Sequence, residues 1–282
     1  MADLPIVTTI AQLRASLATA RKAGKRIGLV PTMGALHAGH LSLVRETQNH
    51  AETVVVSIFV NPTQFAPHED FDRYPRTLEA DAAKLTAAGG TDLIFAPSVG
   101  EMYPEGFATK LVVGGPALGL ETDFRPDFFA GVATVVAKLL LAAAPDAAIF
   151  GEKDYQQLLV VRRLAADLGL ATNIMGAPII REPDGLAMSS RNAYLSPGER
   201  EIAGRMHLVL KRIVARLHDD LPIAAAEELG KTDLRKAGFA SVDYVAVRDA
   251  ESLAPFASLG RPARILAAAK VGNTRLIDNM AV

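Results

Sequence analysis

The stretch Leu29–His40, which reads LVPTMGALHAGH, constrains the fold more than any other part of this sequence. An apolar run ends at Pro31, a short turn contains Gly34, and the letters HAGH precede an apolar segment with helical spacing. A strand, a glycine-bearing turn and a helix start place backbone N–H groups and the positive end of the helix dipole where an anion binds. His37 and His40 are three residues apart, so they share one face of the first helical turn. This stretch therefore predicts a site for a phosphate chain.

Apolar runs typical of buried strands alternate with segments of helical spacing over the first two thirds of the chain. The strands are expected at 26–30, 53–60, 93–96, 109–113, 147–150 and 173–180. The helices between them are expected at 10–23, 39–49, 77–88, 128–144 and 155–168. This alternation predicts an α/β fold, a Rossmann-like doubly wound parallel sheet with right-handed crossovers and helices on both faces.

The pattern changes after residue 181. A turn and the letters MSSR are followed by Ser196-Pro197-Gly198-Glu199, a capping box with proline at the first helical position. A long amphipathic helix follows, then a second helix at 224–236 and short strands at 242–247, 264–271 and 274–277. The sequence therefore predicts two domains: a nucleotide-binding domain at 1–181 and a smaller α+β domain at 182–282 that carries the MSSR loop.

Composition excludes several classes of protein. The chain has 282 residues, half of them hydrophobic, so a large core is expected. The 30 basic and 31 acidic side chains give a net charge of -1, which argues against nucleic acid as a partner. There is no cysteine, so disulfides and thiolate metal sites are excluded. The N-terminal segment does not resemble a signal peptide, and the most apolar stretch, 132–144, is too short for a membrane span. A cytoplasmic protein with no membrane partner is expected.

Four polar clusters are predicted at the carboxyl ends of strands, where open α/β sheets bind ligands. They are His37 with His40, Asn61 with Gln64, the segment 151–154, and the segment 189–191. Each alone has an ordinary structural interpretation, as a buried histidine, a loop residue, a helix cap or a solvated loop. Together they indicate one crevice for a nucleotide and a small carboxylate, and the spacing alone goes no further.

Longer motifs in the sequence resemble those of one known protein family. The segments PTMGALHAGH, FVNPTQF, YPRTLEAD, EMYP, GEKDYQQ, DGLAMSSRNAYLS and TRLIDN, in order from Pro31 to Asn279, resemble the pantothenate synthetase (pantoate–β-alanine ligase) family. The letters HAGH resemble the HxGH signature of the wider nucleotidyltransferase superfamily, and MSSR resembles its KMSKS-like loop.

The resemblance implies a two-step reaction with ATP as a substrate. Pantoate attacks the α-phosphate of ATP to give pantoyl adenylate and pyrophosphate, and β-alanine then displaces AMP to give pantothenate. It also implies Mg²⁺, held mainly by the phosphates because no dedicated metal-binding cluster is visible in the sequence. A homodimer is expected, with its contact on the apolar strand at 54–60 or in the second domain.

The resemblance also implies which residues bind ATP and act on it. His37 and His40 would contact the phosphates, and His40 matches the family's proton donor. The developing negative charge would be stabilised by Lys153, Ser189, Ser190 and Arg191. The ATP-binding residues would be Met33, Gly34, Ala35, Leu36, His37, Ala38, Gly39, His40, Gly151, Glu152, Lys153, Asp154, Ile180, Met188, Ser189, Ser190 and Arg191.

For the other two substrates, the resemblance assigns Gln64 to pantoate and β-alanine, and Gln157 to pantoate, with Asn61 and Arg125 supporting that pocket. Amide side chains bind a carboxylate and a hydroxyl without adding charge. Segment 67–75 is expected to form a flap that excludes water from the adenylate.

One motif departs from the family. Members usually read RPGHF, whereas this chain reads RPDFF, so Asp127 and Phe128 replace a glycine and a histidine. This places an acidic and an aromatic residue near the expected approach of the phosphates.

Two alternatives remain at this stage. One is an adenylyl or cytidylyl transferase that uses the same histidine pair. The other is a nucleotide-binding protein without catalysis, motivated by Asp127 and Phe128. The paired amides Gln64 and Gln157 favour the ligase, because a simple transferase has no need of them.

Overall fold

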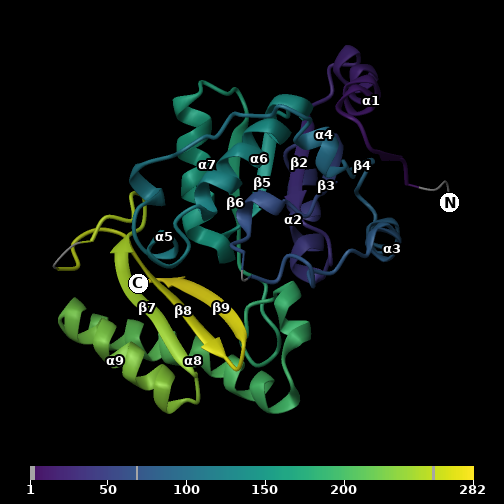
Figure 1. Cartoon of the computed structure of the whole chain (residues 1–282). Helices are drawn as coiled ribbons and strands as arrows, with labels where there is room; N and C mark the ends of the chain where they lie inside the picture. The colour runs from purple at the N-terminus through teal and green to yellow at the C-terminus, as the bar shows by residue number, and fades with distance from the viewer. Residues whose placement is uncertain (1–3, 68, 256–257) are drawn as a thin grey trace.

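The computed structural model describes residues 4–67, 69–255 and 258–282. Within these residues, a six-stranded parallel sheet has the order β1-β4-β3-β2-β5-β6 (Figure 1). Its strands are β1 (Ile6–Val7), β2 (Ile27–Thr32), β3 (Thr53–Ile58), β4 (Leu93–Phe95), β5 (Ala147–Gly151) and β6 (Asn173–Ala177). The strand order reverses between β2 and β5, which confirms the predicted doubly wound sheet.

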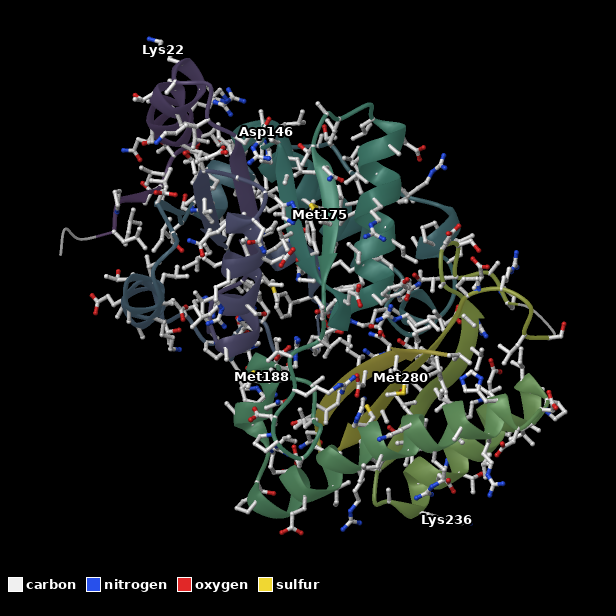
Figure 2. All side chains as sticks on the ribbon, turned by 180° about the vertical axis from the view of Figure 1, so that it is seen from behind. Lys22, Asp146, Met175, Met188, Lys236 and Met280 are labelled. Atoms are coloured by element: carbon white, nitrogen blue, oxygen red, sulfur yellow. The ribbon has the colours of Figure 1, made fainter. Side chains whose placement is uncertain are left out.

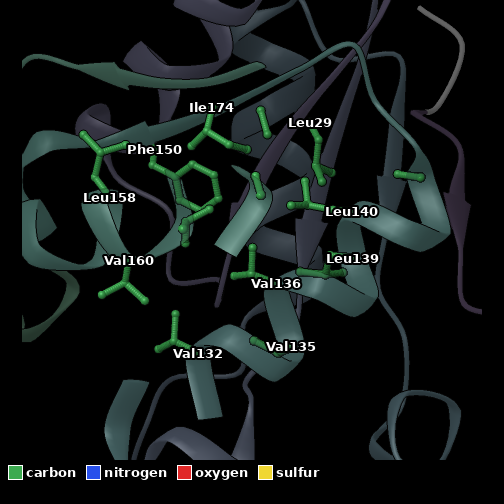
Figure 3. Close-up of a cluster of buried hydrophobic side chains, with 14 of the residues drawn as sticks. Leu29, Val132, Val135, Val136, Leu139, Leu140, Phe150, Leu158, Val160 and Ile174 are labelled. Carbon is green, nitrogen blue, oxygen red and sulfur yellow. The ribbon is translucent and has the colours of Figure 1, made fainter. Parts of the chain in front are cut away.

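Helices cover both faces of this sheet because its strands alternate apolar side chains toward two separate cores. Leu29, Val55 and Phe150 pack with α1 (Ile10–Lys22), α6 (Phe128–Ala143) and α7 (Tyr155–Asp167). Figure 3 shows this core, with Val132, Val136 and Leu140 of α6 beside Leu29 and Phe150. The opposite face carries Val30, Val56 and Ile149, which pack with α2 (Ala38–Gln48) and α3 (Leu78–Ala88).

The C-terminal part is a three-stranded antiparallel sheet in the order β7-β8-β9, with two helices on one face (Figure 1). The elements are α8 (Pro197–His218), α9 (Ile223–Lys236), β7 (Ser241–Asp249), β8 (Ala263–Val271) and β9 (Thr274–Ala281). Ile265 and Ala267 face the helices, whereas Ala246 and Leu266 belong to the core beneath α6 and α7. The two parts therefore share apolar contacts, and the predicted division at residue 181 stays a prediction.

The structure corrects the prediction of a strand at 109–113. This segment forms no ladder, and its Leu111 amide donates instead to Thr134 Oγ1 on α6. Two of its apolar side chains serve packing instead, since Leu111 and Val113 contact the cluster of Ala133, Ala137 and Leu164. β6 also ends at Ala177, earlier than expected.

Several short elements were not predicted because they lack a full period of apolar residues. They are β1, α4 (Val99–Met102), α5 (Glu121–Phe124) and the 3-10 helices η1 (Pro62–Gln64), η2 (Gly115–Ala117), η3 (Glu152–Asp154) and η4 (Ser190–Tyr194).

The apolar strand at 54–60 was suggested as a contact between two copies of the chain, and the structure shows this to be wrong. β3 lies between β4 and β2, and Val54, Val55 and Val56 are fully buried inside the chain. These three side chains have no face left for a partner.

None of the helices among the described residues combines the length and apolar character that crossing a membrane requires.

Candidate functional site

A cleft of about 690 Å³ lies at the carboxyl ends of the parallel strands and extends to the small sheet. All four predicted clusters reach it. The predicted site residues that line it are Met33, His37, Gly39, His40, Asn61, Gln64, Arg125, Gly151, Lys153, Asp154, Gln157, Ile180, Met188, Ser189, Ser190 and Arg191. Figure 2 shows Met188 where the part with the large sheet meets the part with α8 and α9. The remaining predicted residues do not line the cleft: Gly34, Ala35, Leu36, Ala38 and Glu152.

The turn after β2 is held by a carboxylate that sequence reasoning did not single out. Asp81 of α3 has no solvent exposure, and its two oxygens accept from the amides of Ala35 (2.9 Å) and Leu36 (2.8 Å). Gly34 and Ala35 both have positive φ, at 85° and 50°. A Cβ on Gly34 would lie 3.1 Å from Asp81 Oδ2, so glycine lets the turn approach this carboxylate closely.

The two histidine rings lie against each other at the start of α2, tilted by 40°. Their ring centroids are 4.1 Å apart. His37 Nδ1 accepts from the Gly39 amide (3.2 Å), and His40 Nδ1 accepts from the His37 amide (3.3 Å). Because an accepting Nδ1 carries no proton, the proton of each neutral ring is on Nε2. Each ring therefore has an Nε2–H left to donate.

Both histidines are held in the neutral form. Burial lowers the pKa of His37 to about 4, with the positive charges of Lys153 and Lys84 as smaller causes. Burial also lowers the pKa of His40 to about 3, assisted by His37, Lys153 and Lys84. At neutral pH the pair is thus a set of uncharged hydrogen-bond donors beside Lys153.

The second cluster follows β3. Asn61 is buried, and its Nδ2 donates to Gln64 Oε1 (3.1 Å) and to the Gly131 carbonyl (3.2 Å). Its Oδ1 accepts from the Tyr103 hydroxyl (2.7 Å). Among the described residues, the recorded acceptor for Gln64 Nε2 is the sulfur of Met33, a weak acceptor, at 2.9 Å. Asn61 therefore orients Gln64 so that its amide N–H groups are available to a stronger acceptor.

Arg125 lies in an ion-paired network rather than free in the cleft. Its guanidinium makes two bonds to Glu69 (2.6 and 2.7 Å), donates to the Gln64 carbonyl (3.2 Å) and lies 3.8 Å from the ring centroid of Phe128. Asp127 does not line the cleft; its side chain is 83% exposed and pairs with Lys110. The expectation of an acidic group near the phosphates is therefore wrong, because residue 127 precedes α6 and faces solvent.

The MSSR segment is tied to the first cluster and to the segment predicted as a flap. Ser190 Oγ donates to the Ala35 carbonyl (3.2 Å). Arg191 makes two bonds to Asp70, at 3.1 and 2.8 Å. The flap itself, 67–75, includes His68, which lies outside the described residues. An anion bound in the cleft by Arg191 would therefore share the N–H donors of its guanidinium with Asp70.

The third cluster follows β5. Lys153 and Asp154 lie in η3, with Lys153 Nζ 3.6 Å from Asp154 Oδ1, and Gln157 extends into the cleft from the first turn of α7. The adjacent wall carries Glu121, which is bound by Arg275 (2.8 Å) and by the Tyr244 hydroxyl (2.7 Å).

Three structural residues were missed by sequence reasoning: Asp70, Asp81 and Glu121. Each pairs with a group far away in the chain, so no local pattern identifies the partner. Asp81 had one available signal, since it is a charged residue on the apolar side of a short helix.

Comparison with known proteins gives one consistent family. A family model described as pantoate-beta-alanine ligase matches residues 5–281. A pantothenate synthetase from Rhodopseudomonas palustris (strain HaA2) is 57% identical over 281 residues, 99% of both chains. One from Paramagnetospirillum magneticum is 57% identical over 277 residues, 98% of this chain and 97% of that one.

Solved structures give the same result. The crystal structure of pantothenate synthetase from Thermus thermophilus has a TM-score of 0.91 and 48% identity, covering 98% of each chain. A pantoate-beta-alanine ligase from Francisella tularensis, complexed with beta-gamma ATP and beta-alanine, has a TM-score of 0.83 and 34% identity, covering 98% of this chain and 97% of that one.

A first prediction concerns Gly131, where α6 packs on the loop that carries Gln64. A Cβ there would lie 2.2 Å from the Thr63 carbonyl oxygen, so Gly131→Ala overpacks this contact. Although alanine favours a helix, we expect a net destabilisation of about 1–2 kcal/mol and a Tm lower by roughly 2–8 °C. Thermal unfolding measures this. The control Gly198→Ala, also in a helix but with open space around the new Cβ, should leave Tm unchanged or raise it.

A second prediction concerns pH and the histidine pair. Both pKa values are lowered in the folded state, so the unfolded chain binds more protons between its own histidine pKa near 6.5 and about pH 4. Stability should therefore fall as the pH falls through this window, with unfolding taking up about two protons at pH 5 from this pair.

Denaturant unfolding at several pH values measures this effect. The double variant His37→Asn with His40→Asn, whose side-chain oxygens still accept the two backbone N–H groups, should lose stability less steeply below pH 6.5. His218→Asn, at an exposed position, should keep the original profile. Equal slopes for all three proteins would show that the pair is not held neutral.

Proposed function

This chain belongs to the pantoate–β-alanine ligase family, and we propose that its cleft carries out both halves of the family's reaction with the residues described above. The protein condenses pantoate with β-alanine at the expense of ATP. One observation supports the assignment of residues most strongly. Groups from four separate segments, namely His37 with His40, Asn61 with Gln64, 151–154 and 188–191, line one cleft at the strand-order reversal.

In the first half reaction, a pantoate carboxylate oxygen attacks the α-phosphorus of ATP. A phosphorus–oxygen bond forms to pantoate, the bond to the β-phosphate oxygen breaks, and pyrophosphate leaves. In the second, the β-alanine amine attacks the acyl carbon, and a carbon–nitrogen bond forms. The bond between the acyl carbon and the phosphate oxygen of AMP breaks, AMP leaves with that electron pair, and the amine nitrogen loses a proton. Both steps need alignment and stabilisation of negative charge rather than a covalent enzyme intermediate.

We assign the phosphates to the histidine side of the cleft. His37 and His40 would donate from Nε2–H, and an anion there would raise their pKa and allow His40 to transfer a proton. Lys153, whose positive charge acts on both rings, would supply a full positive charge to the phosphates. The segments 33–40 and 151–154 would hold the nucleotide, with Ile180 and Met188 beside the adenine. The Met188 amide already bonds the Ile180 carbonyl (2.9 Å).

Ser189, Ser190 and Arg191 complete the triphosphate side. Ser189 Oγ accepts from the Arg191 amide and so shapes the start of η4. Arg191 has five N–H donors, which suffice to bind both Asp70 and a phosphate oxygen.

We assign pantoate to the amide side of the cleft. Gln64 and Gln157 would bind its carboxylate and hydroxyl groups, and Gln64 would also contact β-alanine. Asn61 acts by orienting Gln64. Arg125 is already bound to Glu69 and to the Gln64 carbonyl, so we propose that it positions this loop rather than contacting substrate.

The residues present fit a magnesium ion that is held mainly by phosphates. Among the described residues there is no cluster of three or more histidines, aspartates and glutamates that would form a dedicated site. Asp154 offers one carboxylate oxygen, since its side chain is 46% exposed beside Lys153. When bound, Mg²⁺ would neutralise phosphate charge and make the α-phosphorus more electrophilic.

We also propose a homodimer, and we propose the cytoplasm as the compartment because ATP is supplied there. Segment 109–113 is a candidate contact, since it forms no ladder with the described strands. Val112 is 78% exposed, whereas its neighbours Leu111 and Val113 are partly buried. An unpaired apolar segment of this kind can pair with a second copy of itself.

The proposed reaction predicts the products of one incubation. With ATP, Mg²⁺, pantoate and β-alanine, the protein should release AMP and pantothenate in equal amounts. A stable nucleotidyl product would indicate a transferase, and nucleotide binding without turnover would indicate loss of catalysis.

His40→Ala should lower kcat by roughly 10²–10³ with the fold intact, because His40 is proposed to stabilise charge on the phosphates. The control His218→Ala should be unaffected, and near-normal turnover of His40→Ala would remove His40 from the mechanism.

The proposed dimer predicts a mass of twice 29.9 kDa in light scattering. Val112→Asp should shift the protein toward the monomer, because a carboxylate in an apolar contact must be desolvated. Leu208→Asp, also at an exposed apolar position but on α8, is the control and should not. A monomeric parent protein, or a dimer insensitive to Val112→Asp, contradicts this assignment of the contact.

A further inference from the structure

Lys153 lies in a single 3-10 turn whose ends are not capped by a neighbouring side chain. η3 follows β5 directly, and neither its N-cap Gly151 nor the N-cap of α7, Asp154, makes a side-chain capping bond. The carbonyls of Glu152 and Lys153 are instead bound from a strand more than a hundred residues later. Asn279 Nδ2 of β9 donates to both oxygens, each at 2.9 Å.

The orientation of the Asn279 amide is determined by a second side chain. Arg264 Nε donates to Asn279 Oδ1 (2.6 Å), and a guanidinium has only donors, so the amide oxygen must face Arg264. The amide nitrogen is thereby directed at the two carbonyls. Arg264 also donates to Glu152 Oε2 (2.9 Å), and its guanidinium lies 3.7 Å from the ring centroid of Tyr155. Asn279 is 2% exposed, and these contacts use both amide N–H groups and the amide oxygen.

The preceding residue fixes the other side of the same region. Asp278 makes two bonds to Arg181 (2.7 and 2.9 Å), just before the segment that carries Ser189–Arg191. One dipeptide of β9 thus binds both the Lys153 turn and the base of the MSSR segment.

We propose that Asn279 is a positioning residue for Lys153 in the adenylate-forming half reaction. The proposal rests on the proposed function, in which Lys153 supplies charge to the phosphates. The two amide N–H groups of Asn279 fix the backbone from which the Lys153 side chain extends. They thereby fix how far Lys153 Nζ reaches into the cleft. A displacement of about 1 Å at a group that stabilises developing charge lowers a rate by up to about 10².

Asn279→Asp is the direct test. An ionised carboxylate has the same shape but only accepts, so it loses both bonds to the carbonyls while keeping its contact with Arg264. The half reaction is followed as pantoate-dependent exchange of labelled pyrophosphate into ATP, without β-alanine. We expect kcat to fall by about 10–10² and the KM for pantoate to change by less than about twofold.

Two further variants guard against a trivial result. Asn173→Asp makes the same chemical change at an exposed position and should keep the parent rate. Asn279→Ala removes the bonds without adding charge, and it should show the same loss of kcat if Asn279→Asp does not fold.

A double-variant cycle separates positioning from a general structural effect. If Asn279 acts through Lys153, then adding Asn279→Asp to Lys153→Ala should lower the single-turnover rate little further. The proposal is overturned if the rate reductions of the two single variants multiply in the double variant. A parent-like rate for the folded Asn279 variants overturns it as well. A parent-like rate for Lys153→Ala would instead show that the assigned role of Lys153 is wrong, and Asn279 would then have no charge to position.

Discussion

The carboxylate of Asp81 and the amide of Asn279 bind the two turns on which the cleft is built. A turn that leaves a parallel strand exposes N–H and C=O groups that the sheet no longer pairs, and each buried one must find a partner. After β2 the unpaired groups are the amides of Ala35 and Leu36, and Asp81 accepts from both. After β5 they are the carbonyls of Glu152 and Lys153, and Asn279 donates to both. The strand-order reversal brings these turns side by side, and a polar side chain from elsewhere fixes the shape of each.

Charge in the cleft is balanced rather than simply positive. Arg125, Arg191 and Arg275 are bound by Glu69, Asp70 and Glu121, respectively, and the two histidines are held neutral by burial. Such a cleft suits a reaction in which one anion must attack another. In the proposed reaction, neutral donors would bind the phosphates without adding a charge that competes for the pantoate carboxylate, and the paired arginines are held in place by their carboxylate partners.

Periodicity and capping patterns predicted the major elements because these depend on neighbours along the chain. The alternation of strand and helix patterns predicted a sheet with helices on both faces. The predicted strand ends indicated that the four polar clusters lie at one edge of this sheet. The failures share a cause. Segment 109–113 has the composition of a strand, but whether it pairs depends on what lies next to it in space. Asp127 was expected near the phosphates because it stands in the RPDFF motif where the family usually has a glycine, yet the chain turns into α6 at that point and directs it to solvent. Asp81 and Asn279 act on turns 45 and 127 positions away, beyond any local pattern.

The MSSR segment shows how such distant contacts prepare the site. Arg181 is fixed by Asp278 at its base, and the Met188 amide bonds the Ile180 carbonyl, so the segment returns on itself as a closed turn. Its far end is held by Ser190 on the Ala35 carbonyl and by Arg191 on Asp70. A segment fixed at both ends has already lost most of its conformational freedom, so binding ATP does not have to order it. Because Ala35 belongs to the turn that Asp81 holds, the position of the serines and of the histidines depends on the same buried carboxylate.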